Sequence, residues 1–251
     1  MTPRSGTSSS RSSASRSRGW PRIVGLAGLA LLALVVYEAV RWPDVPLLAV
    51  RAPASTAFID RYRATERQAG RPPRVEWTWV PYNRIAPALK RAVVVAEDAT
   101  FFSHRGFATR EIREALDKAM KEVDLPRGAS TITQQLAKNL WLSPSRNPIR
   151  KAKEAILTWQ LEKALTKRRI LEAYLNVAEF GPGIYGVEAA SRHYFAKAAA
   201  DVGDEEAAQL AATLPRSHMW HPGVGTPGYR RYVSLIRQRM QRSGIPARLL
   251  Q

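Results

Sequence analysis

The sequence of 251 residues contains no cysteine. A disulfide scaffold, a thiol nucleophile and a cysteine-ligated metal site are therefore excluded. The absence suits an oxidising compartment, but cytosolic proteins without cysteine are common, so it does not decide the location. The sequence also lacks internal repeats and alternating strand patterns, apart from a short stretch at 75–80. It therefore predicts a mainly α-helical fold.

Acidic residues are missing from the first 22 positions, and the whole chain has a formal net charge of +18. The excess of basic residues continues beyond the N-terminal segment. So basic a protein favours anionic partners: nucleic acid, anionic lipid headgroups, or phosphate and pyrophosphate substrates. Charge alone does not choose among these three classes.

An apolar segment follows a polar N-terminal tail. Residues 1–19 are rich in Ser, Arg and Gly and predict a disordered, basic tail. Residues 23–37 carry no charge, and Trp20, Tyr37 and Trp42 flank them as interfacial aromatics flank a membrane span. A helix over 20–40 would reach about 30 Å, the thickness of the hydrocarbon core. The sequence therefore predicts a transmembrane anchor over 20–42.

Two alternatives to an anchor fit less well. Signal-peptide cleavage requires small residues at −3 and −1, and cleavage after Ala39 would put the bulky Tyr37 at −3. A buried core helix would hardly follow nineteen disordered basic residues. The arginines before the uncharged run 23–37 predict a cytoplasmic N-terminus and a periplasmic main domain, and this counts against nucleic acid as a partner. These arginines are Arg4, Arg11, Arg16, Arg18 and Arg22.

Residues 43–75 are punctuated by Pro and Arg and predict a connector that packs on the main domain, which we expect to span 76–251. Helical periodicity recurs in that domain, with Pro87 in a first turn, Thr166 and Asp204 as caps, and Pro144 and Pro215 as stops. The predicted helices cover 85–96, 112–123, 132–140, 148–164, 167–175, 187–195, 204–214 and 228–242.

The stretch Glu97–Gly106 places two acids at the end of an apolar helix, followed by aromatics, a histidine and a glycine. A carboxylate that emerges from Val93–Ala96 is partly desolvated, which raises its pKa towards the range useful for proton transfer. Acids at helix ends are more often solvated or capping residues, so this stretch alone is modest evidence for catalysis.

Three further stretches are unusually polar. Residues 128–139 (GASTITQQLAKN) line a helix start with hydroxyls, amides and a lysine, a composition that suits phosphate and sugar hydroxyls. On the next helix Arg150 and Glu154 are four residues apart, a spacing that also fits an ordinary surface ion pair. A last stretch, 167–197, contains three glycines with no preceding strand, so it is not a dinucleotide fingerprint.

In their order and spacing the four stretches resemble the family 51 glycosyltransferase domain, the peptidoglycan glycosyltransferase of class A penicillin-binding proteins. The resemblance covers about 79–197, with a looser match through Pro215. Positions 128–139 match at almost every residue, although the family usually has a second Gly where Ala129 stands. The Ser-x-x-Lys and Lys-Thr-Gly motifs of a transpeptidase do not occur, so the resemblance is to monofunctional members.

The resemblance implies a lysozyme-like α-helical fold with a membrane-associated jaw at about 103–127. It implies that lipid II is polymerised into β-1,4-linked glycan strands, that undecaprenyl pyrophosphate is released, and that the configuration at the anomeric carbon inverts. It also implies an inner-membrane location with the catalytic domain in the periplasm. The implied partners are lipid II, the lipid-linked strand, the inner membrane, and divisome proteins or other penicillin-binding proteins.

The resemblance also implies roles for individual residues. Glu97 is the general base, and Glu154 is a second acid that either aids the leaving group through a divalent ion or orients nearby cations. The only cofactor implied is a divalent cation, Mg²⁺ or Mn²⁺, at the pyrophosphate. Substrate binding falls to Ser130, Thr131, Gln135, Lys138, Arg146 and Arg150, and structural support to Asp98, His104 and Gly106.

Two other functions share parts of this pattern. A lytic enzyme of lysozyme-like shape would cleave glycan rather than make it, but it would need no pyrophosphate site, and the cations Lys138, Arg146 and Arg150 argue against it. A catalytically idle scaffold for cell-wall assembly would not need both Glu97 and Glu154.

Overall fold

The computed structural model describes residues 20–40, 42–107, 130–145 and 148–251. It divides the chain into two compact units, Met1–Pro43 and Asp44–Gln251. Several predictions lie outside the described residues: the disordered tail 1–19, the helix over 112–123, most of the jaw, and the site residue Arg146.

The first unit contains the helix α1 (Trp20–Val40), which has 21 residues and coincides with the predicted apolar segment. Within the described residues, no helix has both the length and the apolar character that crossing a membrane requires. The helix is confirmed, and its role as an anchor stays a prediction.

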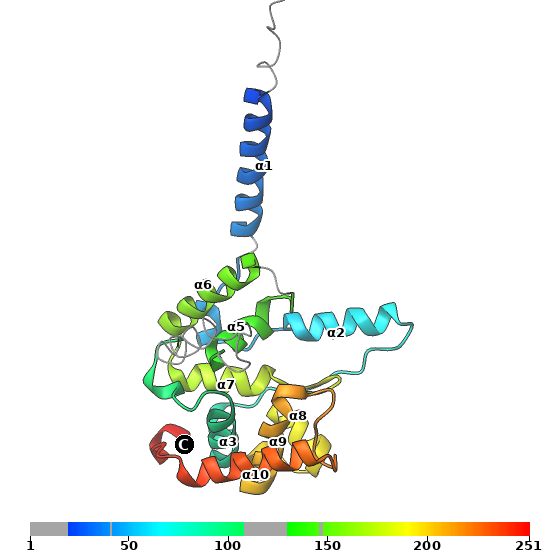
Figure 1. The fold of residues 1–251 in the computed structure, drawn as a ribbon, viewed down its shortest axis with the longest axis vertical. Coiled ribbons are helices and arrows are strands. Elements are labelled where there is room, and N and C mark those ends of the chain that lie inside the picture. The colour runs from blue at the N-terminus through cyan, green and yellow to red at the C-terminus, as the bar shows by residue number, and fades with distance from the viewer. Residues whose placement is uncertain (1–19, 41, 108–129, 146–147) are drawn as a thin grey trace, which may run out of the picture. The chain divides into compact units, whose positions relative to one another are not determined.

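The second unit is mainly helical (Figure 1). Its α-helices are α2 (Ala57–Gln68), α3 (Pro87–Glu97), α5 (Ile132–Trp141), α6 (Pro148–Ala164), α7 (Lys167–Val177), α8 (Val187–Phe195), α9 (Asp204–Thr213), α10 (Pro227–Arg242) and α11 (Ala247–Leu250). Three short strands accompany them: β1 (Glu76–Trp77), β2 (Glu179–Gly181) and β3 (Ile184–Tyr185). Short 3-10 turns lie at Pro46–Ala49, Tyr82–Arg84, Phe101–Ser103, Ala199–Asp201 and Leu214–Arg216.

Local sequence accounts for most of these helix boundaries. Pro87 occupies the first turn of α3, and the hydroxyl of Thr166 caps α7 by accepting from the amide of Arg169, both as predicted. The prediction for α9 was wrong in detail, because Asp204 is its first helical residue and Gly203 is the N-cap. The carboxylate of Glu206 accepts from the Gly203 amide at 3.0 Å, so an acid three residues further on does the capping.

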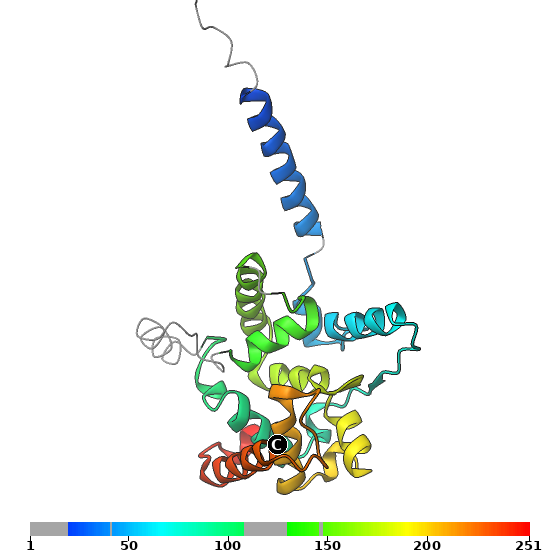
Figure 2. The same cartoon turned by 45° about the vertical axis from the view of Figure 1, so that its right-hand side comes forward.

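The helices of the second unit pack in two groups, seen one above the other in Figures 1 and 2. In one group α5 packs against both α6 and α7, and in the other α9 packs against α3 and α10. Apolar side chains fill both groups, with Leu136, Leu161 and Leu171 buried in the first and Leu89 and Leu210 in the second. The two groups meet where the end of α3 contacts α5, through Asp98 and Glu97. These are positions for which the sequence predicted a site.

The glycine-rich stretch forms a small sheet that the sequence did not predict. β3 pairs in parallel with β1 and antiparallel with β2, in the order β1-β3-β2. Gly183 has φ +80°, and a Cβ there would lie 2.4 Å from the carbonyl oxygen of Arg74, so only glycine fits this turn. β1 falls within the short stretch 75–80 that alone showed an alternating pattern.

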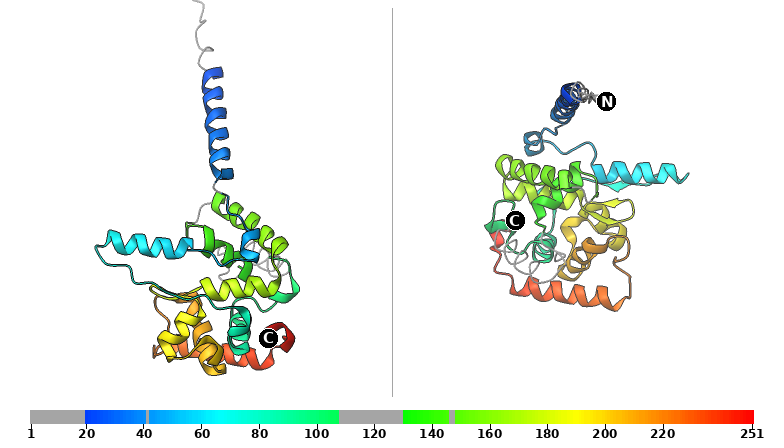
Figure 3. Two further views of the ribbon diagram at one scale, coloured as in Figure 1. Left: turned by 180° about the vertical axis from the view of Figure 1, so that it is seen from behind. Right: turned by 45° about the horizontal axis from the view of Figure 1, so that its top comes forward.

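The predicted connector 43–75 contains the helix α2, which extends from the body of the second unit in both views of Figure 3. Of its residues only Ile59 is buried, so its apolar periodicity was too weak to predict a helix. Thr56 caps it by accepting from the amide of Ile59 at 3.1 Å. Because α2 packs on α5, the connector contributes to the surroundings of the site.

Candidate active site

Glu97 is the last residue of α3, and its carboxylate reaches towards α5. Its Oε2 atom accepts a hydrogen bond from Nε2 of Gln135 at 2.8 Å. Burial raises the pKa of Glu97, while the donation from Gln135 and the charge of Lys138 oppose that rise and Asp98 adds to it. Glu97 is therefore more basic than an ordinary carboxylate and still accepts one hydrogen bond, from Gln135. Both properties suit a group that takes up a proton.

Lys138 lies on α5, one turn beyond Gln135, and is only partly exposed. Burial lowers the pKa of Lys138, and the charge of Arg150 lowers it further, whereas the carboxylates of Glu154 and Glu97 raise it. Its Nζ atom lies 5.8 Å from the centre of the Phe58 ring on α2. The charges of both predicted catalytic acids, Glu97 and Glu154, therefore act on Lys138.

Glu154 is buried on α6, at 3% exposure, and is held between two cations. Nη1 of Arg150 donates to Oε2 at 2.7 Å, which confirms the predicted pair four residues apart, and Nζ of Lys151 donates to Oε1. The Nε atom of Arg150 is buried and has no hydrogen-bond partner within the described residues. The arrangement concentrates positive charge around a buried carboxylate.

Asp98 joins three segments of the site. Nε2 of His104 lies 2.9 Å from Oδ1 and 3.0 Å from Oδ2, and the amide of Ile132, the first residue of α5, donates to Oδ2 at 3.1 Å. An acid at a helix N-terminus satisfies an amide that has no partner inside the helix. Asp98 therefore connects the end of α3, the His104 loop and the start of α5.

Thr131 and Gly106 close the same loop onto the helices. The Thr131 hydroxyl donates to the carbonyl of Gly106 at 2.7 Å and accepts from the amide of Gln134, in a capping box. Gly106 has φ +84°, and a Cβ there would lie 2.9 Å from Cγ2 of Thr158 on α6. Thr131 was predicted to line the donor cleft, but at 2% exposure its hydroxyl is committed to structure. Ser130, next to it, is exposed.

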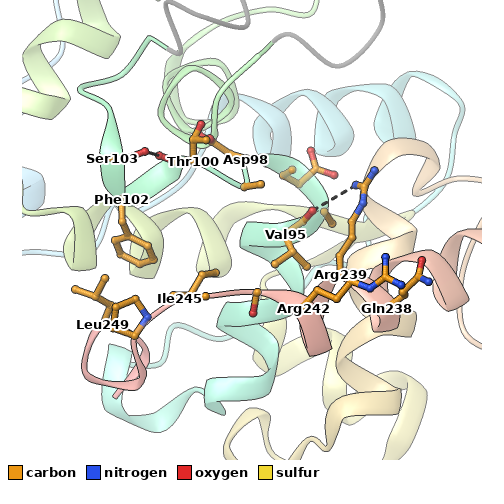
Figure 4. Close-up of a pocket in the computed structure, with 16 residues that line it drawn as sticks. Val95, Asp98, Thr100, Phe102, Ser103, Gln238, Arg239, Arg242, Ile245 and Leu249 are labelled. Carbon is orange, nitrogen blue, oxygen red and sulfur yellow. Dashed lines mark hydrogen bonds between the residues drawn. The ribbon is translucent and has the colours of Figure 1, made fainter.

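A pocket of about 780 Å³ is lined by Glu97 and its neighbours (Figure 4). It lies between the end of α3, the end of α10 and the following segment 243–249. Apolar side chains gather at one end (Phe102, Ile245, Leu249), and polar side chains gather at the other (Gln238, Arg239, Arg242). A ligand in this pocket would meet Glu97, a basic wall and an apolar wall.

The structure brings most predicted site residues together around the ends of α3, α5 and α6, and adds three that were not predicted. Phe58 lies near Lys138, Arg239 donates to the carbonyl of Val95 at 3.4 Å, and the Tyr174 hydroxyl donates to Oε1 of Gln135 at 2.8 Å. Tyr174 lies among apolar residues of a predicted helix, and a tyrosine buried there needs a polar partner for its hydroxyl. That need is the one signal by which the sequence could have indicated Tyr174.

The described residues do not form a divalent-cation site by themselves. Nowhere in them do three His, Asp or Glu side chains come close enough to hold a metal ion. The two carboxylate oxygens of Glu154 each accept from a cationic side chain, so a metal ion would have to displace Arg150 or Lys151.

Comparison with known proteins gives a consistent result. A family model described as Transglycosylase matches residues 65–241. The chain is similar to proteins named biosynthetic peptidoglycan transglycosylase in several bacteria. It is 46% identical over 194 residues to the one from Thiobacillus denitrificans, covering 77% of this chain and 84% of that protein. It is 42% identical over 243 residues to the one from Bordetella avium, covering 93% and 99%.

We predict that Glu97→Gln makes the protein more stable at neutral pH. Because burial raises the folded-state pKa of Glu97 above its unfolded-state value, ionisation of Glu97 lowers the free energy of unfolding. The variant removes that cost, so its melting temperature should rise by a few degrees above the folded pKa. The gain should vanish as the pH falls through the ordinary carboxyl range, where Glu97 is protonated in both states.

The control is Glu205→Gln, which alters an exposed ion pair with Arg237 and should leave the melting temperature nearly unchanged. Calorimetry across the pH range would measure both variants. A melting temperature of Glu97→Gln that falls at neutral pH would contradict the assigned cost of ionising Glu97.

Proposed function

The chain belongs to the transglycosylase family and is a peptidoglycan glycosyltransferase, and we propose how its residues polymerise glycan strands. The observation that carries the proposal is the carboxylate of Glu97, which has a raised pKa, accepts a hydrogen bond from Gln135, and lies between a pocket and the cations of α5 and α6. The biosynthetic names of the relatives favour strand synthesis over the lytic and scaffold alternatives.

We assign Glu97 as the general base on the acceptor. The 4-hydroxyl of the lipid II sugar in the pocket gives its proton to the Glu97 carboxylate as the oxygen attacks the anomeric carbon of the donor. The polar end of the pocket, with Arg239 and Gln238, suits the hydroxyls and anionic groups of the acceptor, and the end with Phe102 suits its apolar atoms.

The donor lies on the other side of Glu97, against α5. As the new C–O bond forms, the bond from the anomeric carbon to the pyrophosphate oxygen breaks, and undecaprenyl pyrophosphate leaves with that electron pair. Lys138 and Arg150, joined by Arg146 as the sequence predicts, neutralise the charge that develops there. Gln135 and Ser130 line this side of the site.

Of the two roles predicted for Glu154, we infer that it orients cations. Its carboxylate accepts from Arg150 and Lys151 and lies close enough to Lys138 to raise the pKa of that lysine. A buried carboxylate among cations keeps them charged and fixes their direction. No step of the reaction is assigned to a metal ion, because both oxygens of Glu154 already accept from cationic side chains.

We further propose that the protein is monofunctional, has a lysozyme-like fold, and works from the inner membrane with α1 as its anchor. The match to the Bordetella avium relative covers 99% of that protein, which supports a single catalytic activity. The apolar run within α1 and the arginines before it support an anchor with a cytoplasmic N-terminus.

The first test is turnover of labelled lipid II by Glu97→Gln. The amide keeps the shape of the side chain but cannot accept the proton, so we expect polymerisation to fall by on the order of 10² or more. Lipid II binding should change little. Glu205→Gln is the control for loss of an acid elsewhere, and near-full turnover by Glu97→Gln would place the base at another residue.

The second test concerns the leaving group. Lys138→Met keeps the apolar stem and removes the charge, so turnover should fall by roughly 10² and a phosphoglycolipid inhibitor of the moenomycin type should bind more weakly. The melting temperature should stay the same or rise slightly, because burial lowers the pKa of Lys138 and its charge therefore costs stability in the folded state. The sequence predicts the same loss of turnover and of inhibitor binding for Arg146→Ala.

Lys163→Met is the matched control, since Lys163 lies over the Trp159 ring, outside the cation cluster, and should leave turnover and inhibitor binding unchanged. A purely structural Lys138 would show the reverse pattern, with a lower melting temperature and intact inhibitor affinity. That pattern would overturn the pyrophosphate assignment and leave Glu97 as the base.

The third test concerns topology. A reporter that is active only in the periplasm, fused after Gln251, should be active in the full chain because the arginines before α1 hold the N-terminus in the cytoplasm. The same fusion without residues 1–42 should be inactive. Activity of a cytoplasm-specific reporter at the same position would contradict the proposed orientation.

A further inference from the structure

A chain of two hydrogen bonds runs from the interior of the protein to the carboxylate of Glu97. The hydroxyl of Tyr174 on α7 donates to Oε1 of Gln135 at 2.8 Å, and Nε2 of the same amide donates to Oε2 of Glu97 at 2.8 Å. Tyr174 is 1% exposed, so substrate cannot reach it. The Ser130 carbonyl is a weaker second acceptor for Nε2, at 3.5 Å.

The direction of this chain depends on which end of the Gln135 amide faces Glu97. An amide has a donor end and an acceptor end of nearly the same shape. With Nε2 towards Glu97, the ionised carboxylate gains a donor. With the amide reversed, its oxygen would face the carboxylate, and only a protonated Glu97 could make a hydrogen bond there. The tyrosine hydroxyl favours the first orientation because it donates its proton to Oε1. With the amide reversed, the hydroxyl could still accept from Nε2, but its buried proton would have to find another acceptor.

Tyr174 is suited to this task because its hydroxyl keeps its proton. Burial raises the pKa of Tyr174 well above its ordinary value, and the nearby Glu97 carboxylate raises it further. Across the pH range in which an enzyme of this kind works, the hydroxyl is therefore neutral and able to donate.

We propose that Tyr174 is a positioning residue for the general base: it holds the Gln135 amide with its donor end on Glu97 and so keeps that carboxylate ionised and correctly directed. The proposal rests on the assignment of Glu97 as the base. Tyr174 touches neither substrate nor reacting atoms and acts only through Gln135.

Other charged and titratable groups also face Glu97 and must stay constant in a test. Asp98 follows it directly after the end of α3, and Lys138 faces it from α5. From α10, Tyr232 donates to the carbonyl of Ala96 at 3.5 Å, and Arg239 donates to that of Val95 at 3.4 Å. Tyr174→Phe removes one hydroxyl and alters none of these groups, so a change in Glu97 would come through Gln135.

The experiment is the pH profile of lipid II polymerisation by Tyr174→Phe. Without the hydroxyl, the Gln135 amide is free to reverse and the ionised form of Glu97 loses its donor. We expect the acidic limb of the kcat profile to move up by about one pH unit. Turnover should fall about tenfold on that limb, recover towards wild type at higher pH, and leave KM for lipid II unchanged.

Tyr229→Phe is the matched control. Tyr229 is also buried, and its hydroxyl donates to a carbonyl, that of Gln209, at 3.0 Å. The same chemical change at Tyr229 should leave the pH profile as it is in wild type. Gln135→Met should move the acidic limb at least as far as Tyr174→Phe, and adding Tyr174→Phe to Gln135→Met should move it no further.

A second measurement keeps the proposal testable if Tyr174→Phe does not fold. Replacing Tyr174 by 3-fluorotyrosine keeps the ring and strengthens the donor, so the acidic limb should move down. Infrared difference titration, with Glu97→Gln as reference, would follow the Glu97 carboxyl in each variant without turnover.

Two results would overturn the role of Tyr174: an acidic limb that does not move, or an equal loss of kcat at every pH together with a lower melting temperature. If Glu97→Gln is inactive, either result would rule out the role of Tyr174 and leave Glu97 assigned as the base. Full turnover by Glu97→Gln would remove both assignments.

Discussion

The carboxylate of Asp98 is the contact on which the arrangement of the site depends. Through its two oxygens it holds the ring of His104 and the first amide of α5. Glu97 is the preceding residue, so the same contact sets the distance between the end of α3 and the side chains of α5. The two neighbouring acids have different partners: Asp98 holds His104 and the start of α5, whereas Glu97 accepts from Gln135.

Positive and negative groups alternate across α3, α5 and α6. Glu97 on α3 faces Lys138 on α5, which in turn is influenced by Glu154 and Arg150 on α6. Each buried charge costs desolvation energy, and the neighbour of opposite sign offsets part of that cost. The balance leaves a carboxylate that binds a proton more readily and a lysine that holds one less tightly than usual, a combination that suits proton uptake on one side and an anionic leaving group on the other.

The sequence predicted the helices well where apolar residues recur on a buried face. The predicted starts and caps of α3 and α7 are present because proline geometry and a threonine hydroxyl act within a single turn. The helix α2 was not predicted because it buries only Ile59, and the three-stranded sheet was not predicted because its strands are two or three residues long. Such short elements are stabilised by partners distant in the chain, as in the pairing of β1 with β3.

What the sequence determined by itself was a set of candidate site residues, since an acid at the end of an apolar helix and a polar helix start are local patterns. It could not determine which hydroxyls and cations are used for structure. Only the tertiary structure showed that Thr131 is committed to Gly106 and that Tyr174 reaches Glu97 through Gln135. The physical reason is that the ionisation and orientation of a buried side chain depend on neighbours from other helices, and folding alone brings those neighbours within hydrogen-bond distance.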